Sequence, residues 1–218
     1  MKYYITSLLI LISTSSMFSE QEKNNPIKFL ALGDSYTIGE SVAIEERWPV
    51  QLATALREKG FSIEQPQIIA TTGWRTDQLK KAIEEAKLKP EYNLVSLLIG
   101  VNNQYQGMTS ESYIPEFEGL LKIAVELAGG NKENVFVVSI PDYGFTPFGQ
   151  PRQSEISKAL NEYNAINKMI TEKMKIRYVN ITDISREGIA QPELVAEDGL
   201  HPSGKQYQLW VQRILKLF

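Results

Sequence analysis

Two short stretches of the chain carry side chains suited to acyl transfer. Ser35 stands in the turn Gly33-Asp34-Ser35, directly after an apolar run, and the only histidine, His201, follows Asp198 by three residues near the C-terminus. A serine hydrolase needs a base that works near neutral pH and a carboxylate that holds this base in the right tautomer. The residue types and their spacing therefore predict that Asp198 orients His201 and that His201 activates Ser35.

Each stretch also has an ordinary structural interpretation. Gly-Asp-Ser is common in turns between a strand and a helix, and Asp198 and His201 are suited to cap a turn and a helix. The G-x-S-x-G elbow of the other large class of serine hydrolases is absent, because Thr37 stands where its second glycine belongs. Position alone therefore leaves both interpretations open for Ser35.

Two further loops follow apolar runs and carry groups that can donate hydrogen bonds. Gly73 lies in the stretch Thr71-Thr72-Gly73-Trp74-Arg75, and Asn102 lies in Gly100-Val101-Asn102-Asn103. A glycine lets a backbone N–H approach a substrate closely, and an asparagine amide is a neutral donor for a developing oxyanion. Taken singly, each stretch is more typical of a plain loop than of a functional one.

The elements that must position these loops are predicted from the alternation of short apolar runs with segments of helical period. Such alternation is typical of βα units around a parallel sheet. We expect Thr76 and Asp77 to cap the second helix and Pro202 to lie in the first turn of the last. The predicted strands are 27–32, 67–70, 94–99, 135–140 and 178–181, and the predicted helices are 48–59, 76–87, 113–128, 154–175 and 207–218.

Together the four loops resemble the conserved blocks of the SGNH hydrolase family, also called GDSL esterases. The resemblance covers nearly the whole chain after its N-terminal segment, and the blocks stand in the family's order. It implies a three-layer α/β/α sandwich with a flavodoxin-like, parallel, five-stranded sheet of order 2-1-3-4-5. It also implies a catalytic triad of Ser35, His201 and Asp198, and an oxyanion hole made by the Ser35 backbone, Gly73 and Asn102.

The sequence departs from the family pattern at two positions. Tyr36 replaces the leucine that gives the GDSL pattern its name, and Asn103 stands where an aspartate often follows the asparagine of the third block. Neither change removes a catalytic group. Both therefore bear on substrate preference more than on activity.

Composition excludes several other classes of site. The chain of 218 residues has no cysteine, one histidine and a formal net charge of -3. Thiolate sites and multi-histidine metal centres are thereby excluded, and the basic surface that nucleic acid requires is missing. We expect one domain, no cofactor, no bound metal and no nucleic-acid partner; the oligomeric state cannot be predicted.

The N-terminus has the features of a secretory signal peptide. Lys2 precedes a mostly apolar run over 3–12, and a stretch of small and polar residues follows over 13–19. The apolar run is short for a membrane span, so an uncleaved anchor is the less favoured alternative. We expect residues 1–19 to be removed, residues 26–218 to form the hydrolase domain, and the mature protein to be periplasmic or extracellular without a stable membrane anchor.

The substrate is the least constrained part of the prediction. An aromatic loop over 141–151 follows the fourth strand, and we expect Tyr143 and Phe145 from this loop and Trp74 from a neighbouring one to contact substrate. Aromatic residues that merely pin the loop are an equal alternative. The expected substrate is a short-chain acyl or acetyl ester of a carbohydrate, or another small ester. The alternatives are a lysophospholipase or thioesterase, a non-catalytic carbohydrate-binding module and, more distantly, a phosphate- or nucleotide-binding protein.

Overall fold

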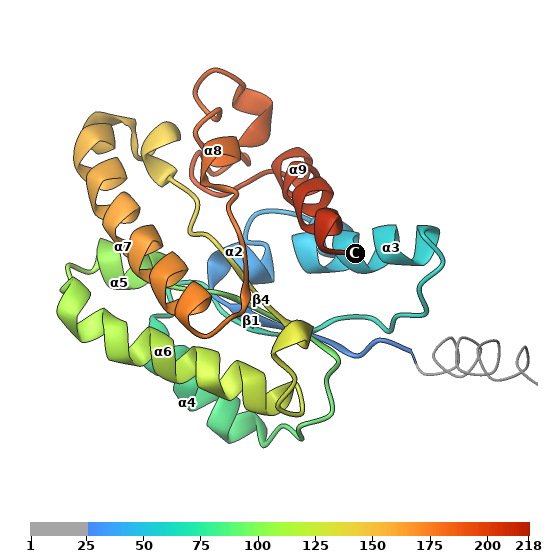
Figure 1. The fold of residues 1–218 in the computed structure, drawn as a ribbon. Helices are drawn as coiled ribbons and strands as arrows, with labels where there is room; N and C mark the ends of the chain where they lie inside the picture. The colour runs from blue at the N-terminus through green and yellow to red at the C-terminus, as the bar shows by residue number, and fades with distance from the viewer. Residues whose placement is uncertain (1–25) are drawn as a thin grey trace, which may run out of the picture.

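A five-stranded parallel sheet forms the centre of the computed structural model, which describes residues 26–218 (Figure 1). The strand order is β2-β1-β3-β4-β5, as predicted. The proposed signal segment, 1–19, lies outside the described residues. The strands are β1 (Phe29–Gly33), β2 (Gln67–Ala70), β3 (Leu94–Leu98), β4 (Val135–Val138) and β5 (Arg177–Val179).

The burial of the strands follows from their place in the sheet. β1, β3 and β4 are buried along their whole length, whereas the edge strands β2 and β5 are partly exposed. Strands that helices cover on both faces need apolar side chains at every position, which explains why the central runs are almost continuously apolar. β1 pairs with β2 on one side and β3 on the other, with Leu30 opposite both Gln67 and Val95.

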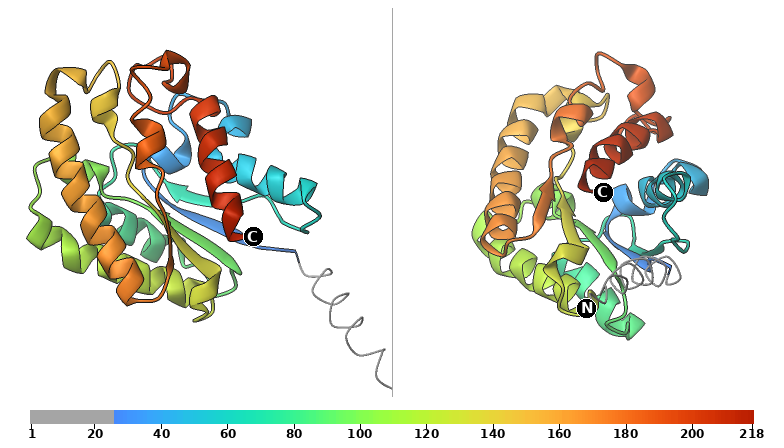
Figure 2. Two further views of the ribbon diagram at one scale, coloured as in Figure 1. Left: turned by 45° about the horizontal axis from the view of Figure 1, so that its top comes forward. Right: turned by 45° about the vertical axis from the view of Figure 1, so that its right-hand side comes forward.

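Helices cover both faces of the sheet (Figures 1 and 2). α3 and α9 pack against each other on one face, and α4, α6 and α7 form the layer on the other. The α-helices are α2 (Ser35–Ile38), α3 (Trp48–Glu58), α4 (Thr76–Ala86), α5 (Val101–Tyr105), α6 (Ser110–Leu127), α7 (Gln153–Lys173), α8 (Thr182–Ser185) and α9 (Gly204–Ile214). The 3₁₀ turns are η1 (Ile44–Glu46), η2 (Lys132–Asn134), η3 (Tyr143–Phe145), η4 (Gln150–Arg152), η5 (Pro192–Leu194) and η6 (Leu215–Leu217).

Aromatic side chains join the helices of one face to the sheet. Trp48 of α3 packs on Phe29 of β1, with ring centroids 6.1 Å apart, and also on Phe136 of β4. Trp210 of α9 is fully buried as well. Burying a large apolar side chain of this kind contributes about 1.5–3 kcal/mol. Within residues 26–218, no helix is long and apolar enough to cross a membrane.

Two predicted helix starts are wrong in detail. The N-cap of α4 is Arg75, whose backbone N–H donates to the Gln78 side chain, and Thr76 lies inside the helix. The N-cap of α9 is Ser203, whose hydroxyl accepts from Gln206 N–H, so Pro202 precedes the helix. In both cases a contact to another element decides the boundary: Thr76 is held by Asn103, and Pro202 pairs with Val195 in an isolated bridge.

Candidate active site

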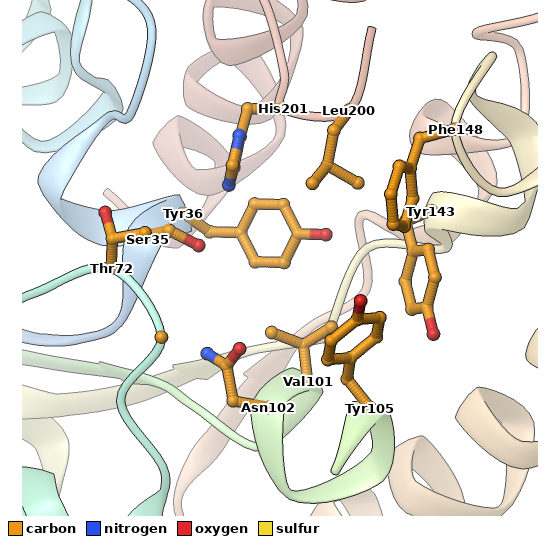
Figure 3. A pocket seen from close by; sticks show the side chains of 11 residues that line it. Ser35, Tyr36, Thr72, Val101, Asn102, Tyr105, Tyr143, Phe148, Leu200 and His201 are labelled. Atoms are coloured by element: carbon orange, nitrogen blue, oxygen red, sulfur yellow. The ribbon is translucent and has the colours of Figure 1, made fainter. Parts of the chain in front are cut away.

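A cavity of about 280 Å³ opens at the carboxyl edge of the sheet, where the loops after β1, β2 and β3 meet. Ligands of open α/β sheets bind at this edge, and β1 brings the three loops together because it lies between β2 and β3. Ser35, Gly73, Asn102 and His201 line the cavity. Figure 3 shows Ser35 between His201 and Asn102 at one end of it.

Ser35 is the first residue of the short helix α2 and directly follows β1. The carboxylate of Asp34 caps this helix by accepting from Tyr36 N–H at 3.1 Å. At the other end of the helix, Gly39 adopts a left-handed conformation, and its N–H donates to Ser35 C=O at 3.0 Å. These bonds hold the backbone of Ser35 tightly, while its side chain faces the cavity.

His201 and Asp198 form a hydrogen-bonded pair in the loop before α9. Nδ1 of His201 lies 2.5 Å from Oδ2 of Asp198, and Oδ1 of Asp198 accepts from the N–H groups of Leu200 and His201 at 2.9 Å each. With its Nδ1 proton directed at Asp198, the ring keeps Nε2 as the free acceptor. His201 is only 8% exposed, and its ring lies edge-on to that of Tyr36.

A serine far away in the sequence supports this pair. The Ser41 hydroxyl donates to Oδ2 of Asp198 at 2.7 Å, the same oxygen that faces His201. Partial burial opposes ionisation of Asp198, but the hydrogen bonds from Ser41, His201 and the backbone outweigh it and hold the pKa of this carboxyl well below its ordinary value. Asp198 is therefore an anion over the whole working pH range.

Gly73 and Asn102 face Ser35 from the two neighbouring loops. Gly73 has a φ of +84°, which favours glycine, and a side chain there would project into open space. The Asn102 amide donates one of its two N–H groups to Trp74 C=O at 3.0 Å. This bond orients the amide and leaves its second N–H for a ligand.

A known protein family matches most of the sequence. The GDSL-like lipase/acylhydrolase family matches residues 31–209. This chain belongs to that family. The predicted residues Ser35, Gly73, Asn102 and His201, which line the cavity, all lie within the matched region. No curated protein matches the sequence.

Solved structures similar to this GDSL-family chain share its fold. TesA is 13% identical over 87% of this chain and 97% of its own, with a TM-score of 0.67. The acetylxylan esterase Axe2 from Geobacillus stearothermophilus is 20% identical over 90% of this chain and 95% of its own, with a TM-score of 0.65. The psychrotrophic esterase EstA from Pseudoalteromonas sp. is 18% identical over 87% and 94%, with a TM-score of 0.62.

Asn103, the second departure from the family pattern, has a structural part in this GDSL-family chain. Its buried amide donates to the Thr76 hydroxyl at 2.7 Å and accepts from Thr76 N–H at 3.1 Å. Asn103 thereby ties α5 to the start of α4. At the N-cap of α5, Gly100 has a φ of +124°, and a Cβ there would clash with the Tyr113 hydroxyl. These two residues fix the one-turn helix that presents Asn102.

Only one of the three residues expected to contact substrate lines the cavity of this GDSL-family chain. Tyr143 does, from the loop after β4. Trp74 packs against the hydrophobic core, and it reaches the site through its backbone carbonyl, which holds Asn102. Phe145 lies under the guanidinium of Arg186, 5.9 Å from its ring centroid. The aromatic loop thus divides its rings between the cavity and the body of the protein.

Several residues that line the cavity escaped the sequence analysis. Tyr105 follows Asn102 by three residues on α5, a spacing that puts both on one side of a helical turn. Leu200 precedes His201, and Phe148 lies in the predicted aromatic loop. Sequence position was thus a usable signal for these three. Thr72 and Val101 also line the cavity, as does Tyr36, which the sequence analysis linked to substrate preference.

Proposed function

We propose that this chain is a serine esterase that hydrolyses carboxylic esters through an acyl-enzyme. Ser35 is the nucleophile, His201 the general base and acid, and Asp198 the group that orients His201. The observation that carries the proposal is the convergence of Ser35 and the hydrogen-bonded pair of His201 and Asp198 on one cavity of a family of acylhydrolases. One solved form of Axe2 is described as a catalytic mutant in which a histidine is replaced by alanine, and this chain has a single histidine.

The reaction proceeds in two proton-balanced halves. Nε2 of His201 takes the hydroxyl proton as the Ser35 oxygen attacks the ester carbonyl, and His201 returns that proton to the departing alcohol. Water then attacks the acyl-enzyme with the same proton transfers, which releases the acid and restores Ser35. Within the described residues, Ser35 and His201 share the cavity without a direct hydrogen bond, a state common before substrate binds.

The tetrahedral oxyanion is stabilised by three donors. We assign the backbone N–H groups of Ser35 and Gly73 and the free N–H of the Asn102 amide to this task. Asn102→Ala removes one donor and is expected to lower kcat about 10²–10³-fold. Because the side chain sits at the edge of a cavity and its partner carbonyl can be solvated, the variant should fold. Full esterase activity of Asn102→Ala would contradict the assignment.

The substrate class that fits best is a short-chain acyl ester, such as an acetyl group on a carbohydrate. The cavity of about 280 Å³ is small, and its rings from Tyr105, Tyr143 and Phe148 can pack against a sugar face. Axe2, an acetylxylan esterase, shares the fold. A chain-length series of chromogenic esters separates this class from lysophospholipase or thioesterase activity, for which rates would rise with acyl length.

Two experiments test the proposal. A fluorophosphonate should label the wild-type protein and leave Ser35→Ala unlabelled, since only an activated serine reacts. Ser35→Ala should also lower ester hydrolysis by up to about 10⁶-fold. An unlabelled wild type without esterase activity would favour a non-catalytic carbohydrate-binding module instead.

We also propose that the protein is exported after removal of residues 1–19. The charged, apolar and small-residue stretches at the N-terminus support this. N-terminal sequencing of the protein from the native host's extracellular or periplasmic fraction tests it. A mature protein that retained residues 1–19 would contradict the proposal.

A further inference from the structure

The residue after the nucleophile forms the floor of the cavity. Tyr36 is only 3% exposed, and its ring packs edge-on against both His201 and Trp210, with centroids 5.8 and 6.5 Å away. Figure 3 shows the Tyr36 ring in the middle of the cavity, with its hydroxyl pointing away from Ser35 and toward Tyr143. This is the position at which the sequence departs from the family's leucine.

The hydrogen bonding of the Tyr36 hydroxyl differs from that of two other hydroxyls in the cavity wall. The Tyr143 hydroxyl donates to Gln104 at 3.0 Å, and the Thr72 hydroxyl donates to Glu40. For the Tyr36 hydroxyl, residues 26–218 supply no hydrogen-bond partner. Of the other residues that line this cavity, Val101, Leu200 and Phe148 are apolar, whereas Tyr105 carries a further hydroxyl.

The hydroxyl remains a neutral donor under all working conditions. Burial, followed by the nearby Asp34 carboxyl and other acidic neighbours, raises the pKa of Tyr36 well above its ordinary value. A site with a buried donor of this kind discriminates against a ligand that cannot accept from it, because the donor is then left unpaired. An oxygen of the substrate is the natural acceptor.

We propose that Tyr36 determines specificity by donating a hydrogen bond to an ether or hydroxyl oxygen of the substrate, several bonds away from the scissile carbonyl. The inference rests on the proposed esterase function. It predicts that the enzyme prefers esters with an additional oxygen, such as those of sugars or hydroxylated acids, over hydrocarbon esters of the same shape.

The test is a positional scan with isosteric esters. In one series of p-nitrophenyl esters, a single methylene of the acyl chain is replaced by an ether oxygen at successive positions. In a second series, the same replacement moves along the alcohol chain of acetate esters, with hydrolysis followed by acid release. The wild-type kcat/KM should favour one ether position over the hydrocarbon by roughly 2- to 13-fold, the range expected for one neutral hydrogen bond.

Tyr36→Phe should abolish this preference, because it removes only the hydroxyl. Tyr92→Phe is the matched control: its hydroxyl donates to Gln67 at the start of β2, away from the cavity. The control should keep the ether preference. An ether preference that survives in Tyr36→Phe overturns the inference.

A purely internal role for the hydroxyl predicts a different result. Tyr36 also borders a very small cavity of about 10 Å³ that Gln206 lines as well. If the hydroxyl only stabilises the packing around this small cavity, Tyr36→Phe should change the unfolding temperature and keep the wild-type ratio of kcat/KM between ether and hydrocarbon esters. That result would overturn the inference.

Failure of this inference can be told apart from failure of the proposed function. The scan on the wild type needs no variant, so the absence of any ether preference refutes the inference even if Tyr36→Phe folds poorly. A wild type that hydrolyses esters through Ser35 without preferring any ether position refutes the role of Tyr36 alone. A wild type that hydrolyses none of the esters refutes the proposed function.

Discussion

Two aspartates near the cavity occupy opposite electrostatic states. Asp198, in the loop before α9, accepts hydrogen bonds from Ser41, from the His201 ring and from two backbone N–H groups. Asp34, in the turn before α2, is fully buried; its Oδ1 accepts from Tyr36 N–H, and its Oδ2 has no partner among residues 26–218. The two carboxyls thus differ mainly in how many donors surround them.

The pKa values follow this difference. Burial raises the pKa of Asp34 to about 8, because its backbone hydrogen bonds compensate for little of the lost hydration. In Asp198 burial acts in the same direction, but the donors outweigh it and the pKa is lowered. Burial alone therefore does not decide whether a carboxyl is charged, and only Asp198 is suited to stabilise a histidine cation.

Of the substitutions that test the difference between the two aspartates, Asp198→Asn should lower activity the most. The amide cannot hold the His201 tautomer with Nδ1 protonated, nor stabilise the imidazolium that forms during the reaction. We expect kcat to fall about 10⁴-fold at neutral pH. Steady-state kinetics with a short-chain ester measures the loss, and circular dichroism confirms that the variant folds. A loss below tenfold would place the histidine's orienting partner elsewhere.

Ser41→Ala should lower activity by an intermediate amount. Loss of one charge-assisted hydrogen bond moves the pKa of Asp198 back toward its ordinary value, and we expect kcat to fall about tenfold. Because the lowered pKa of Asp198 stabilises the fold above about pH 4, the stability difference from wild type should shrink as the pH falls below that value. Urea unfolding at several pH values measures the difference.

Ser41→Gly separates the hydroxyl from the backbone. Ser41 has a φ of +65°, a conformation that glycine adopts without strain. Both variants should therefore lose the same activity, while Ser41→Gly should be the more stable of the two. Wild-type activity in Ser41→Gly would show that the hydroxyl does not support Asp198.

Asp34→Asn should change the pH dependence of stability and have the smallest effect on kcat. The native state holds the Asp34 proton up to about pH 8, whereas the unfolded chain releases it near the ordinary value of 3.8. The wild type should therefore lose stability relative to the variant as the pH rises from about 4 to about 8, and the difference should level off above that. Parallel stability curves for the two proteins would contradict the raised pKa.

The sequence predicted the sheet and the long helices well. All five strands lie within two residues of their predicted bounds, because side chains buried on both faces leave a continuous apolar run. The one-turn helices α2, α5 and α8 escaped prediction, since four or five residues are too few to show a helical period.

The sequence also predicted which residues would form the candidate site. Ser35, Gly73, Asn102 and the pair of Asp198 and His201 each follow a strand or precede the last helix, and the strand order makes their loops neighbours. Their motifs are local, so a short stretch of sequence suffices to recognise them.

Only the tertiary structure decided the environment of these groups. Ser41 meets Asp198 across 157 positions of sequence, and Trp74 supplies a carbonyl where its ring was expected. Burial, and hydrogen bonds between residues far apart in the sequence, depend on which surfaces face each other after folding, and no local pattern encodes them. For that reason the sequence alone determined which groups this protein carries, whereas the folded chain decided how each of them is buried and hydrogen-bonded.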